Sequence, residues 1–450
     1  MKKNEAIYDH QKKRELLYGQ LKKIGSESIR LEKTTSNLFR SRDLKPKRLL
    51  DVKSFNKVLS VDQNSKLIEV EGMATYEQIV NASLPKGLIP AVVPQLKSIT
   101  IGGAISGIGI ESSSFHYGLV HETVSEMDVL LANDKIVTCT PHNEHRDLFF
   151  GLPNSYGTLG YILKLKTKGI PIKPYVKLTH IGISNALEFF SKIEEACNKK
   201  FDFVDGTVFD ANRHYITVGE FVDEAPYTSD YTFLDIYFKS IRNRKEDYLS
   251  THDYLWRWDT DWFWCSKNLF VQNLIIRCIL GRKRLNSITY QKVMRWNTKA
   301  GLTRTLNHWL GYHTESVIQD VDIPIHNAAK FLDFFHKEIG LNPIWICPVK
   351  HRLKKNNFPL FQMDPEKLYV NFGFWDVIRG RKKLPEGHYN KKIEQMVADL
   401  EGKKSLYSSS YYSEDDFWSH YNGKTYHELK RRYDPDFRFK DLFKKSVLNH

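Results

Sequence analysis

The sequence SITIGGAISGIGIESSSFHYG, residues 98–118, places five glycines and five serines within an otherwise apolar run. Glycine lacks a Cβ atom, so a cluster of glycines marks a left-handed backbone or a close approach of the main chain to another group. Successive free N–H groups in such a loop form a concave anion site of the kind that holds phosphate. The stretch therefore predicts either a loop that binds a nucleotide or cofactor, or a bulged strand packed beneath another chain segment.

Two common nucleotide-binding motifs are absent from the sequence. Gly107-Ile108-Gly109 begins a G-x-G-x-x-G fingerprint, but Ser112 stands where the third glycine is required. No GxxxxGK[ST] sequence occurs either. A second stretch, PNSYGTLG (153–160), again offers small residues and hydroxyls before a strand-like sequence. Together the two stretches predict one extended ligand held at both loops, outside the Rossmann and P-loop folds.

Short strand patterns surround both loops and indicate an α+β fold. Residues 58–71, 124–139 and 162–170 are rich in Val, Ile and Leu, with turn-forming residues between them. Thr75, followed by Glu77 and Gln78, predicts the start of a helix that stops at Pro85-Lys86-Gly87.

The sequence PIKP (171–174) predicts a boundary between two α+β regions. We expect one domain over 1–172, a second over 173–405, and a helical segment over 406–450 that returns to the first domain. In the second region, strands are predicted at 231–239 and 367–375, and helices at 328–339 and 386–400. The aromatic passage YLWRWDTDWFWC (254–265) is either the core of that region or a surface for a large apolar substrate or a membrane.

The chain has 450 residues and a net charge of +14. Its basic residues fall in short, separate clusters, which predicts a solvated surface or attraction to an anionic membrane face. No cluster is interleaved with a nucleic-acid-binding motif, so nucleic acid is not an expected partner. No uncharged apolar run approaches the roughly 20 residues that span a bilayer. We expect a cytoplasmic protein that is either free in solution or in peripheral contact with a membrane.

The five cysteines are scattered, and no two form a CxxC pair. This predicts a reducing compartment and no metal site.

Several motifs together resemble one family. They are TIGG (100–103), GIESSS (109–114), PNSYGTLG (153–160), PIWICPV (343–349), KLYVNFGFWD (367–376) and SLYSSSYYSEDDFW (405–418). The sequence from about Thr34 onward is similar to the delta(24)-sterol reductase family, within the FAD-linked oxidoreductases of the vanillyl-alcohol oxidase type. The resemblance implies a PCMH-type FAD-binding domain built from two small α+β subdomains, and an α+β cap domain over the isoalloxazine.

The resemblance also implies which residues contact FAD. In the first loop they are Thr100, Ile101, Gly102, Gly103, Gly107, Gly109, Ile110, Glu111 and Ser112, and in the second loop Ser155, Gly157, Thr158, Gly160 and Tyr161. The family's early phosphate loop corresponds to residues 33–40, where Thr35, Ser36 and Asn37 would replace backbone donors. That loop has no histidine, and His116 and His121 are expected to be ordinary histidines. We therefore expect non-covalent FAD.

For a reductase of this kind, reduced FAD gives hydride to one alkene carbon and an acid protonates the other. The candidate acids are Tyr411 and Tyr412, and aromatic packing explains these two at least equally well. Glu111 and Glu126 are alternatives, although a carboxylate at the end of a strand more often anchors backbone N–H groups or a ribityl hydroxyl. The expected substrate is a sterol-like or isoprenoid lipid, and the expected hydride donor is NADPH. Two other functions stay open: an FAD-dependent oxidase or dehydrogenase of an alcohol, and a non-enzymatic lipid- or partner-binding protein with a vestigial flavin site. The sequence does not indicate the oligomeric state.

Overall fold

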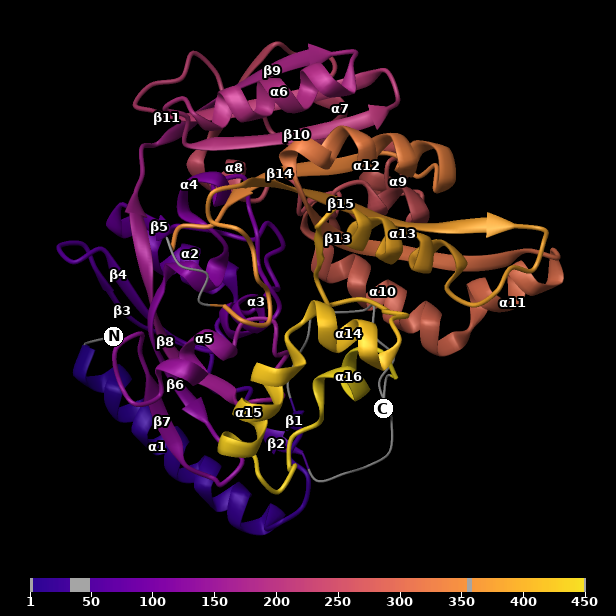
Figure 1. Ribbon diagram of the computed structural model, residues 1–450. Coiled ribbons are helices and arrows are strands. Elements are labelled where there is room, and N and C mark those ends of the chain that lie inside the picture. The colour runs from indigo at the N-terminus through magenta and orange to yellow at the C-terminus, as the bar shows by residue number, and fades with distance from the viewer. Residues whose placement is uncertain (1–2, 33–48, 354–357, 449–450) are drawn as a thin grey trace.

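Two antiparallel sheets organise the chain in the computed structural model, which describes residues 3–32, 49–353 and 358–448 (Figure 1). The six-stranded sheet has the order β3–β4–β8–β6–β7, with β5 paired to β8, and the eight-stranded sheet has the order β12–β9–β11–β10–β14–β15–β13–β16. A short parallel pair joins β1 and β2. The strands are β1 (Leu31–Glu32), β2 (Leu50–Asp51), β3 (Val58–Asp62), β4 (Leu67–Glu71), β5 (Leu88–Pro90), β6 (Val124–Leu130), β7 (Ile136–Cys139), β8 (Tyr161–Pro171), β9 (Tyr175–Ile183), β10 (Phe203–Asp210), β11 (Arg213–Val222), β12 (Glu246–Ser250), β13 (His313–Pro324), β14 (Ile344–Lys350), β15 (Leu368–Gly380) and β16 (Lys403–Lys404).

The helices cover the sheets and the ends of the strands. They are α1 (Lys3–Ile24), α2 (Tyr76–Ser83), α3 (Ile101–Ser106), α4 (Ser114–Tyr117), α5 (Arg146–Gly151), α6 (Ala186–Cys197), α7 (Tyr237–Ser240), α8 (Thr251–Leu255), α9 (Leu274–Leu280), α10 (Ser287–Ala300), α11 (Leu302–Trp309), α12 (Ile325–Glu338), α13 (His388–Asp399), α14 (Glu414–His420), α15 (Gly423–Tyr433) and α16 (Leu442–Ser446). The α+β class predicted from the sequence is confirmed, with a large additional antiparallel sheet. The chain passes from the first sheet to the second between Pro171 and Tyr175.

Helix α2 shows how local sequence sets an element. The side chain of Thr75 accepts a hydrogen bond from the Gln78 N–H, and Gln78 bonds back to the Thr75 N–H, so two donors of the first turn are satisfied. The helix ends at Ser83 and a 3₁₀ turn follows to Gly87, whose φ of 69° suits glycine. The predicted start and stop of this helix are confirmed.

One prediction of secondary structure is wrong, and one of two alternatives is excluded. Residues 231–239, predicted as a strand, form a turn followed by helix α7, because Tyr231 and Tyr237 are drawn into the core and the Tyr231 hydroxyl bonds the Asp247 carboxylate. The bulged strand, one of the two alternatives for the glycine-rich stretch, is excluded, because the stretch forms the short helices α3 and α4. The small residues of α3 allow that helix to lie directly against the first sheet.

The eight-stranded sheet has two faces of different chemistry. Helices α6, α12 and α13 cover one face, where Val204, Ile216, Val321 and Phe372 belong to one aliphatic and aromatic core. The opposite face turns towards the first domain (Figure 1). Helix α4 contacts β14, and the Val204 N–H donates to the Ser112 carbonyl at 2.9 Å. The glycine-rich segment therefore lies directly on the second sheet.

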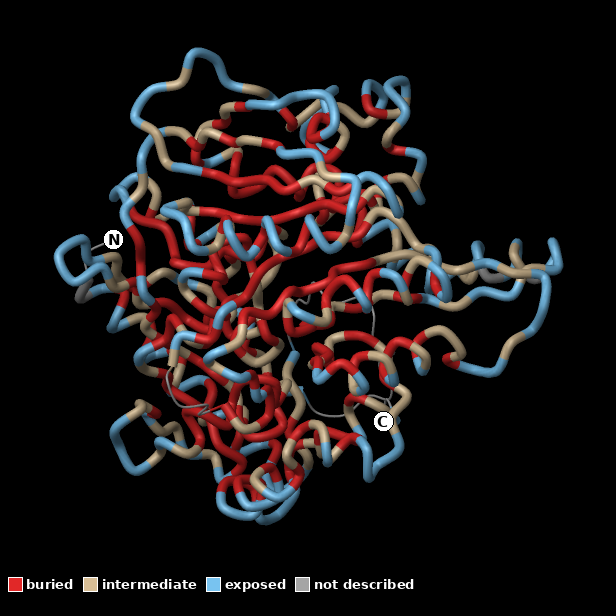
Figure 2. The backbone as a smooth tube through the Cα atoms, turned by 45° about the horizontal axis from the view of Figure 1, so that its top comes forward, coloured by how far each residue is buried: buried red, intermediate tan, exposed pale blue. Residues whose placement is uncertain are grey.

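The C-terminal helices α14 to α16 lie against the first domain. The Lys430 ammonium, which is buried, donates to the Thr158 carbonyl at 2.8 Å, and the Lys445 ammonium donates to the Tyr156 carbonyl at 2.5 Å. By contrast, α11 and the distal ends of β13 and β15 project from the body, and their backbone is largely exposed or half-buried (Figure 2).

Candidate functional site

The two glycine-bearing loops of the first domain are in direct contact. The Tyr156 N–H donates to the Ser106 carbonyl at 3.1 Å, and the Tyr156 hydroxyl donates to the Gly107 carbonyl at 3.4 Å. A Cβ atom on Gly107 would lie 3.3 Å from the Tyr156 ring. The structure thus brings together the two loops that the sequence predicts to share a ligand.

Several glycines of these loops are required by contacts within the chain itself. A Cβ on Gly102 would lie 2.7 Å from the Gly72 carbonyl oxygen, and a Cβ on Gly160 would lie 2.5 Å from Val129 Cγ1. Gly157 has a φ of 75°, in the left-handed region. Close packing against other segments of the same chain therefore explains some of these glycines without any ligand.

The Gly102 contact gives a testable prediction. Gly102→Ala forces backbone atoms apart at the base of the first loop and is expected to lower the free energy of unfolding by about 1–3 kcal/mol. The matched control is Gly19→Ala in α1, where no atom lies within 4 Å of the added Cβ. That change is expected to stabilise the protein by about 0.5–1 kcal/mol. Urea unfolding measures both, and equal effects of the two substitutions would contradict the packing explanation.

Glu111 and Ser112 belong to a buried ionic cluster between the glycine-rich segment and the second sheet. The Arg257 guanidinium, which is fully buried, contacts the Asp205 carboxylate at 2.8 Å and the Glu111 carboxylate at 3.4 Å. Ser112 Oγ donates to Glu111 at 2.6 Å, and Gln95 donates to the same carboxylate. Burial raises the pKa of both carboxyls, and the guanidinium between them opposes this shift. The predicted FAD-contacting carboxylate is thus committed to joining the loop to β10.

The inner face of the second sheet carries polar and aromatic side chains although it is buried. Neighbouring strands bring Trp345 and Cys347 of β14 beside Asn371 and Gly373 of β15. The next strand adds Asp322, whose carboxylate accepts a hydrogen bond from Asn371 at 3.0 Å. A buried face of this composition is typical of a binding site, because unpaired polar groups are costly in an apolar core.

Asp320 is the most distinctive group on this face. Its Oδ1 atom is buried and has no hydrogen-bond partner among the described residues. The missing Cβ at Gly373 leaves room for it, since a Cβ there would lie 2.8 Å from Oδ1. Burial raises the pKa of Asp320 to about 7, and the hydrogen bond from the Tyr407 hydroxyl opposes that shift. The Tyr407 hydroxyl also accepts a hydrogen bond from Trp375 Nε1 at 2.8 Å.

Asp322, two residues along β13, has its pKa raised by burial to about 7 as well. A carboxyl with a pKa near 7 can hold and release a proton at neutral pH. The sequence reading missed both residues, although QDVD (319–322) within a strand pattern places two carboxylates on the same face of that strand.

The other predicted acids lie elsewhere. The Tyr411 ring packs against Gly387, and its N–H donates to the Glu394 carboxylate at 3.1 Å. Tyr412 packs among Phe417 and Tyr421 of α14 and its C-cap, where burial raises its pKa. Glu126 is half-buried on β6 and pairs with the Lys166 ammonium at 3.0 Å. Within the described residues, none of these three acidic groups hydrogen-bonds a residue predicted to contact FAD.

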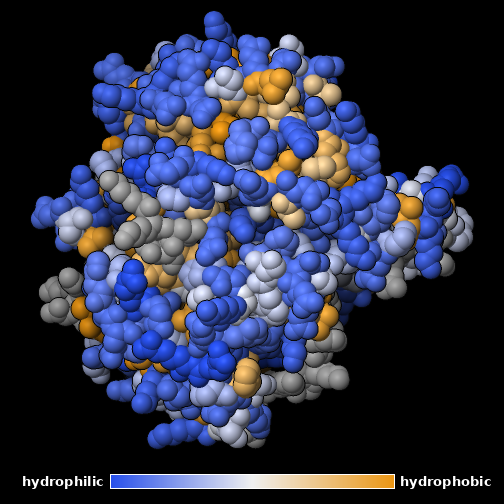
Figure 3. Space-filling model, viewed as in Figure 1, coloured by the Kyte–Doolittle hydropathy of each residue, from blue (hydrophilic) through white to orange (hydrophobic). Residues whose placement is uncertain are grey.

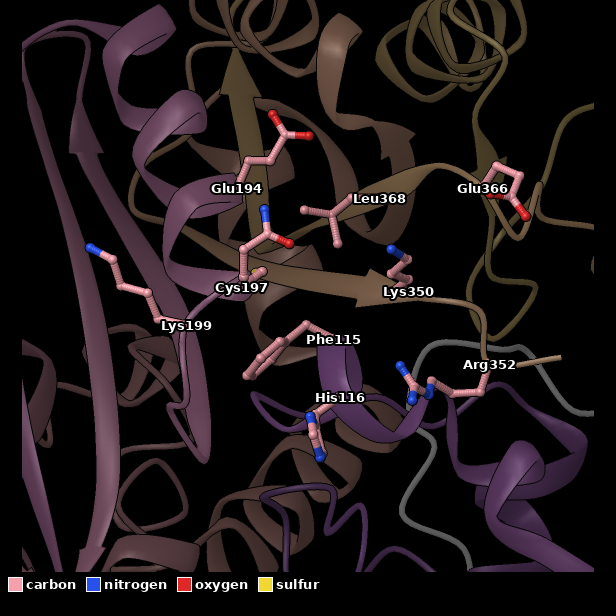
Figure 4. A pocket seen from close by; sticks show the side chains of 10 residues that line it. Phe115, His116, Glu194, Cys197, Lys199, Lys350, Arg352, Glu366 and Leu368 are labelled. Carbon is pink, nitrogen blue, oxygen red and sulfur yellow. The ribbon is translucent and has the colours of Figure 1, made fainter. Parts of the chain in front are cut away.

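The two histidines near the first loop have separate environments. His121 packs against Phe358, and burial lowers its pKa to about 4, so the ring is neutral. His116 lines a pocket of about 360 Å³ between α4, α6 and the end of β14 (Figure 4). Lys350 and Arg352 line the same pocket, and no residue predicted to contact FAD does. This pocket is therefore distinct from the meeting point of the two loops.

The residues around that meeting point fit a bound flavin cofactor. Buried polar atoms without a partner in the described structure occur on the segment before the first loop, in the second loop and on the sheet face: Gln95 Oε1, Asn154 Oδ1, Asn371 Oδ1 and Asp320 Oδ1. Each unsatisfied buried group costs about 1–3 kcal/mol, so these four atoms are free to hydrogen-bond a polar ligand such as a flavin. Thr35, Ser36 and Asn37 lie outside the described residues. The described residues contain no group of three or more His, Cys, Asp or Glu side chains that could hold a metal ion.

Comparison with known proteins defines the class of the first domain. The profile of a family described as an FAD binding domain matches residues 29–140, which include the first loop. The chain therefore carries an FAD-binding domain. The delta(24)-sterol reductase of Arabidopsis thaliana is 26% identical over 438 residues, covering 88% of this chain and 76% of the relative. The human delta(24)-sterol reductase is 27% identical over 401 residues, covering 86% of this chain and 75% of the relative.

A third relative matches a shorter region. The decaprenylphosphoryl-beta-D-ribose oxidase of Mycolicibacterium smegmatis is 31% identical over 141 residues, which cover 31% of this chain and 30% of that oxidase. The resemblance to the delta(24)-sterol reductases seen in the sequence motifs is thus confirmed as a distant similarity over most of the chain.

Proposed function

We propose that the protein is an FAD-dependent oxidoreductase that reduces a carbon–carbon double bond in a sterol-like or isoprenoid lipid, with NADPH as the source of hydride. The observation that carries the proposal is the extent of the similarity to proteins named delta(24)-sterol reductase. It continues for 438 residues, through the second sheet, whereas the match to the oxidase covers 141 residues. Function depends on the residues of a site and not on the fold alone, so a match that includes the second sheet supports the proposal more strongly than a match over 141 residues.

Three residues on or beside the second sheet support this proposal. Bound FAD, once reduced, supplies hydride to one alkene carbon. Asp320 is suited to protonate the other carbon, because its carboxyl is protonated below pH 7 and one of its oxygens has no partner in the described structure. Trp375 and Phe263, with ring centroids 4.5 Å apart, offer an apolar wall for a hydrocarbon substrate. An isolated alkene has no carbonyl group to stabilise developing charge, so the placement of the acid matters.

The match to the oxidase supports a second candidate function, oxidation of an alcohol carbon by the same flavin. Anaerobic spectrophotometry of the purified protein separates the two. We expect NADPH to bleach the flavin absorbance and an alkene lipid to restore it. Bleaching by an alcohol, with none by NADPH, would overturn the reductase in favour of the oxidase. A colourless protein that rejects added FAD would support a binding protein without flavin chemistry.

A further inference from the structure

The segment between Asp261 and Glu315 contains no acidic residue. It contains nine basic residues: Lys267, Arg277, Arg282, Lys283, Arg284, Lys292, Arg295, Lys299 and Arg304. Arg277 is buried and paired with Asp261, Lys267 pairs with Asp376, and Arg282 pairs with Asp230. Lys283, Arg284, Lys292 and Lys299 are exposed, and within the described parts of the chain none of these four has an ion-pair partner. The segment therefore presents uncompensated positive charge.

The same segment exposes apolar side chains at an unusual density. Ten of the 20 large hydrophobic residues that are exposed in the described structure fall between residues 270 and 310: Phe270, Leu274, Ile275, Ile279, Val293, Trp296, Leu302, Leu306, Trp309 and Leu310. Phe270 is 75% exposed, Ile279 74% and Trp309 81%. Soluble proteins rarely gather exposed apolar side chains in this way without a partner.

These side chains form stripes on three consecutive helices. In α11, Leu302, Leu306 and Trp309 follow the spacing i, i+4, i+7, which places them on one face. Ile275 and Ile279 of α9 are one helical turn apart, and so are Val293 and Trp296 of α10. In all three helices the stripe is exposed.

The other sides of α9 and α10 share one buried cluster, formed by Trp262, Val271, Leu285 and Tyr290. Helices α9 and α10 therefore already bury one side in this cluster, and their exposed stripes are additional apolar surface. Helix α11 lies beside the projecting ends of β13 and β15, and Figure 3 shows apolar side chains on this projecting arm within a hydrophilic surface. A further basic cluster, Arg379 to Lys383, adjoins α11, with the Arg381 guanidinium 5.3 Å from the centroid of the Tyr312 ring.

We propose that residues 270–310, with the adjoining basic cluster at 379–383, form a docking surface for an anionic lipid bilayer. Exposed Leu, Ile and Trp on amphipathic helices enter the boundary between head groups and acyl chains, and flanking Lys and Arg attract anionic head groups. Two copies of this surface would repel each other because neither carries an acidic residue between 262 and 314. None of the helices in the described part of the chain is both long and apolar enough to cross a membrane.

The docking surface is connected to the candidate site. Trp262 belongs to the cluster beneath α9 and α10, and the neighbouring Phe263 packs at 4.5 Å, between ring centroids, on Trp375 of the inner sheet face. Leu96, in the segment that leads into the first glycine loop, packs on the same cluster as Trp262. A lipid substrate taken from a bilayer would thus enter beside the aromatic wall.

Co-sedimentation of the full chain with vesicles tests this proposal without reference to any enzymatic activity. We expect binding to vesicles of phosphatidylcholine with phosphatidylglycerol, weaker binding to pure phosphatidylcholine, and weakening by salt. Each of Lys283→Glu and Arg284→Glu is expected to reduce the partition coefficient by about fivefold or more. The triple change Phe270→Ser, Ile279→Ser, Trp309→Ser is expected to reduce it more than tenfold. These side chains are exposed, so circular dichroism should show an unchanged fold.

The matched control is Leu187→Ser on α6, whose side chain is 73% exposed and lies outside the docking surface. Its vesicle binding should equal that of the unchanged chain. Failure of the unchanged chain to bind the anionic vesicles would overturn the proposal. So would binding that the triple change leaves intact, or self-association in sedimentation velocity that the triple change abolishes in the absence of lipid binding.

Discussion

Replacing Arg257 by methionine is expected to lower the free energy of unfolding by about 3–5 kcal/mol. The guanidinium lies between Glu111 of the first domain and Asp205 of β10, at 3.4 Å and 2.8 Å. Its loss leaves two buried carboxylates without their counterion, and methionine retains the length of the aliphatic stem. Urea unfolding followed by circular dichroism measures the effect. We also expect weaker retention of FAD, because Glu111 is in the loop predicted to contact it.

The control is Arg432→Met. Arg432 is exposed and pairs with Asp147 at 2.8 Å, so we expect a loss of about 0–1 kcal/mol. The defect of Arg257→Met should shrink as the pH falls. Without the guanidinium, the largest effect that opposes burial is gone, and only hydrogen bonds such as those from Ser112 and Trp345 still oppose it. The pKa values of Glu111 and Asp205 in the folded variant therefore exceed those in the unfolded chain, and folding takes up protons. A loss of less than about 1 kcal/mol, or a defect that grows at low pH, would contradict this role.

The second large effect concerns proton delivery. Asp320→Asn keeps the shape of the protonated carboxyl but removes its acid, so alkene reduction is expected to fall about 10²–10⁴-fold. Reduction of the flavin by NADPH should be unchanged, since that step needs no proton from this residue. In the unchanged protein, alkene reduction should decline above pH 7, because the Asp320 pKa is about 7 and only the protonated form donates.

Stopped-flow absorbance under anaerobic conditions measures the two half-reactions separately. Two titratable groups act on Asp320: the Tyr407 hydroxyl, which hydrogen-bonds it, and the nearby Asp322 carboxylate, which raises its pKa. Asp322→Asn is the matched control, because Asp322 has the same raised pKa of about 7 but is hydrogen-bonded to Asn371. We expect it to slow alkene reduction less than tenfold and to leave the pH dependence in place. An unchanged rate in Asp320→Asn would remove Asp320 from the reaction.

Local sequence patterns predicted much of the fold. The capping residues at Thr75 and the alternating strand at 162–170 depend on neighbours along the chain, which the sequence displays directly. The prediction of a strand at 231–239 was wrong because its alternating aromatic residues are buried in a turn and a short helix. Tertiary contacts, such as that of Tyr231 with Asp247, decided the outcome there.

The candidate site was only partly accessible from the sequence. The two glycine loops could be recognised because a cluster of glycines marks main chain that approaches another group closely. Asp320 and Arg257 were missed because their roles depend on partners far away in sequence: Arg257 is 146 positions from Glu111 and 52 from Asp205. A signal existed in both cases, a charged residue within an aromatic run and two aspartates within a strand. Burial and pairing, which give those signals their meaning, arise only from the folded chain.

The lysine contacts on the second glycine loop have a consequence for biosynthesis. The carbonyls of Thr158 and Tyr156 are fixed by lysines 272 and 289 positions further along. A nascent chain therefore cannot give this loop its final shape while those lysines are still untranslated. We therefore expect chains that stop before Lys430 to retain FAD poorly, because their second glycine loop lacks both lysine contacts.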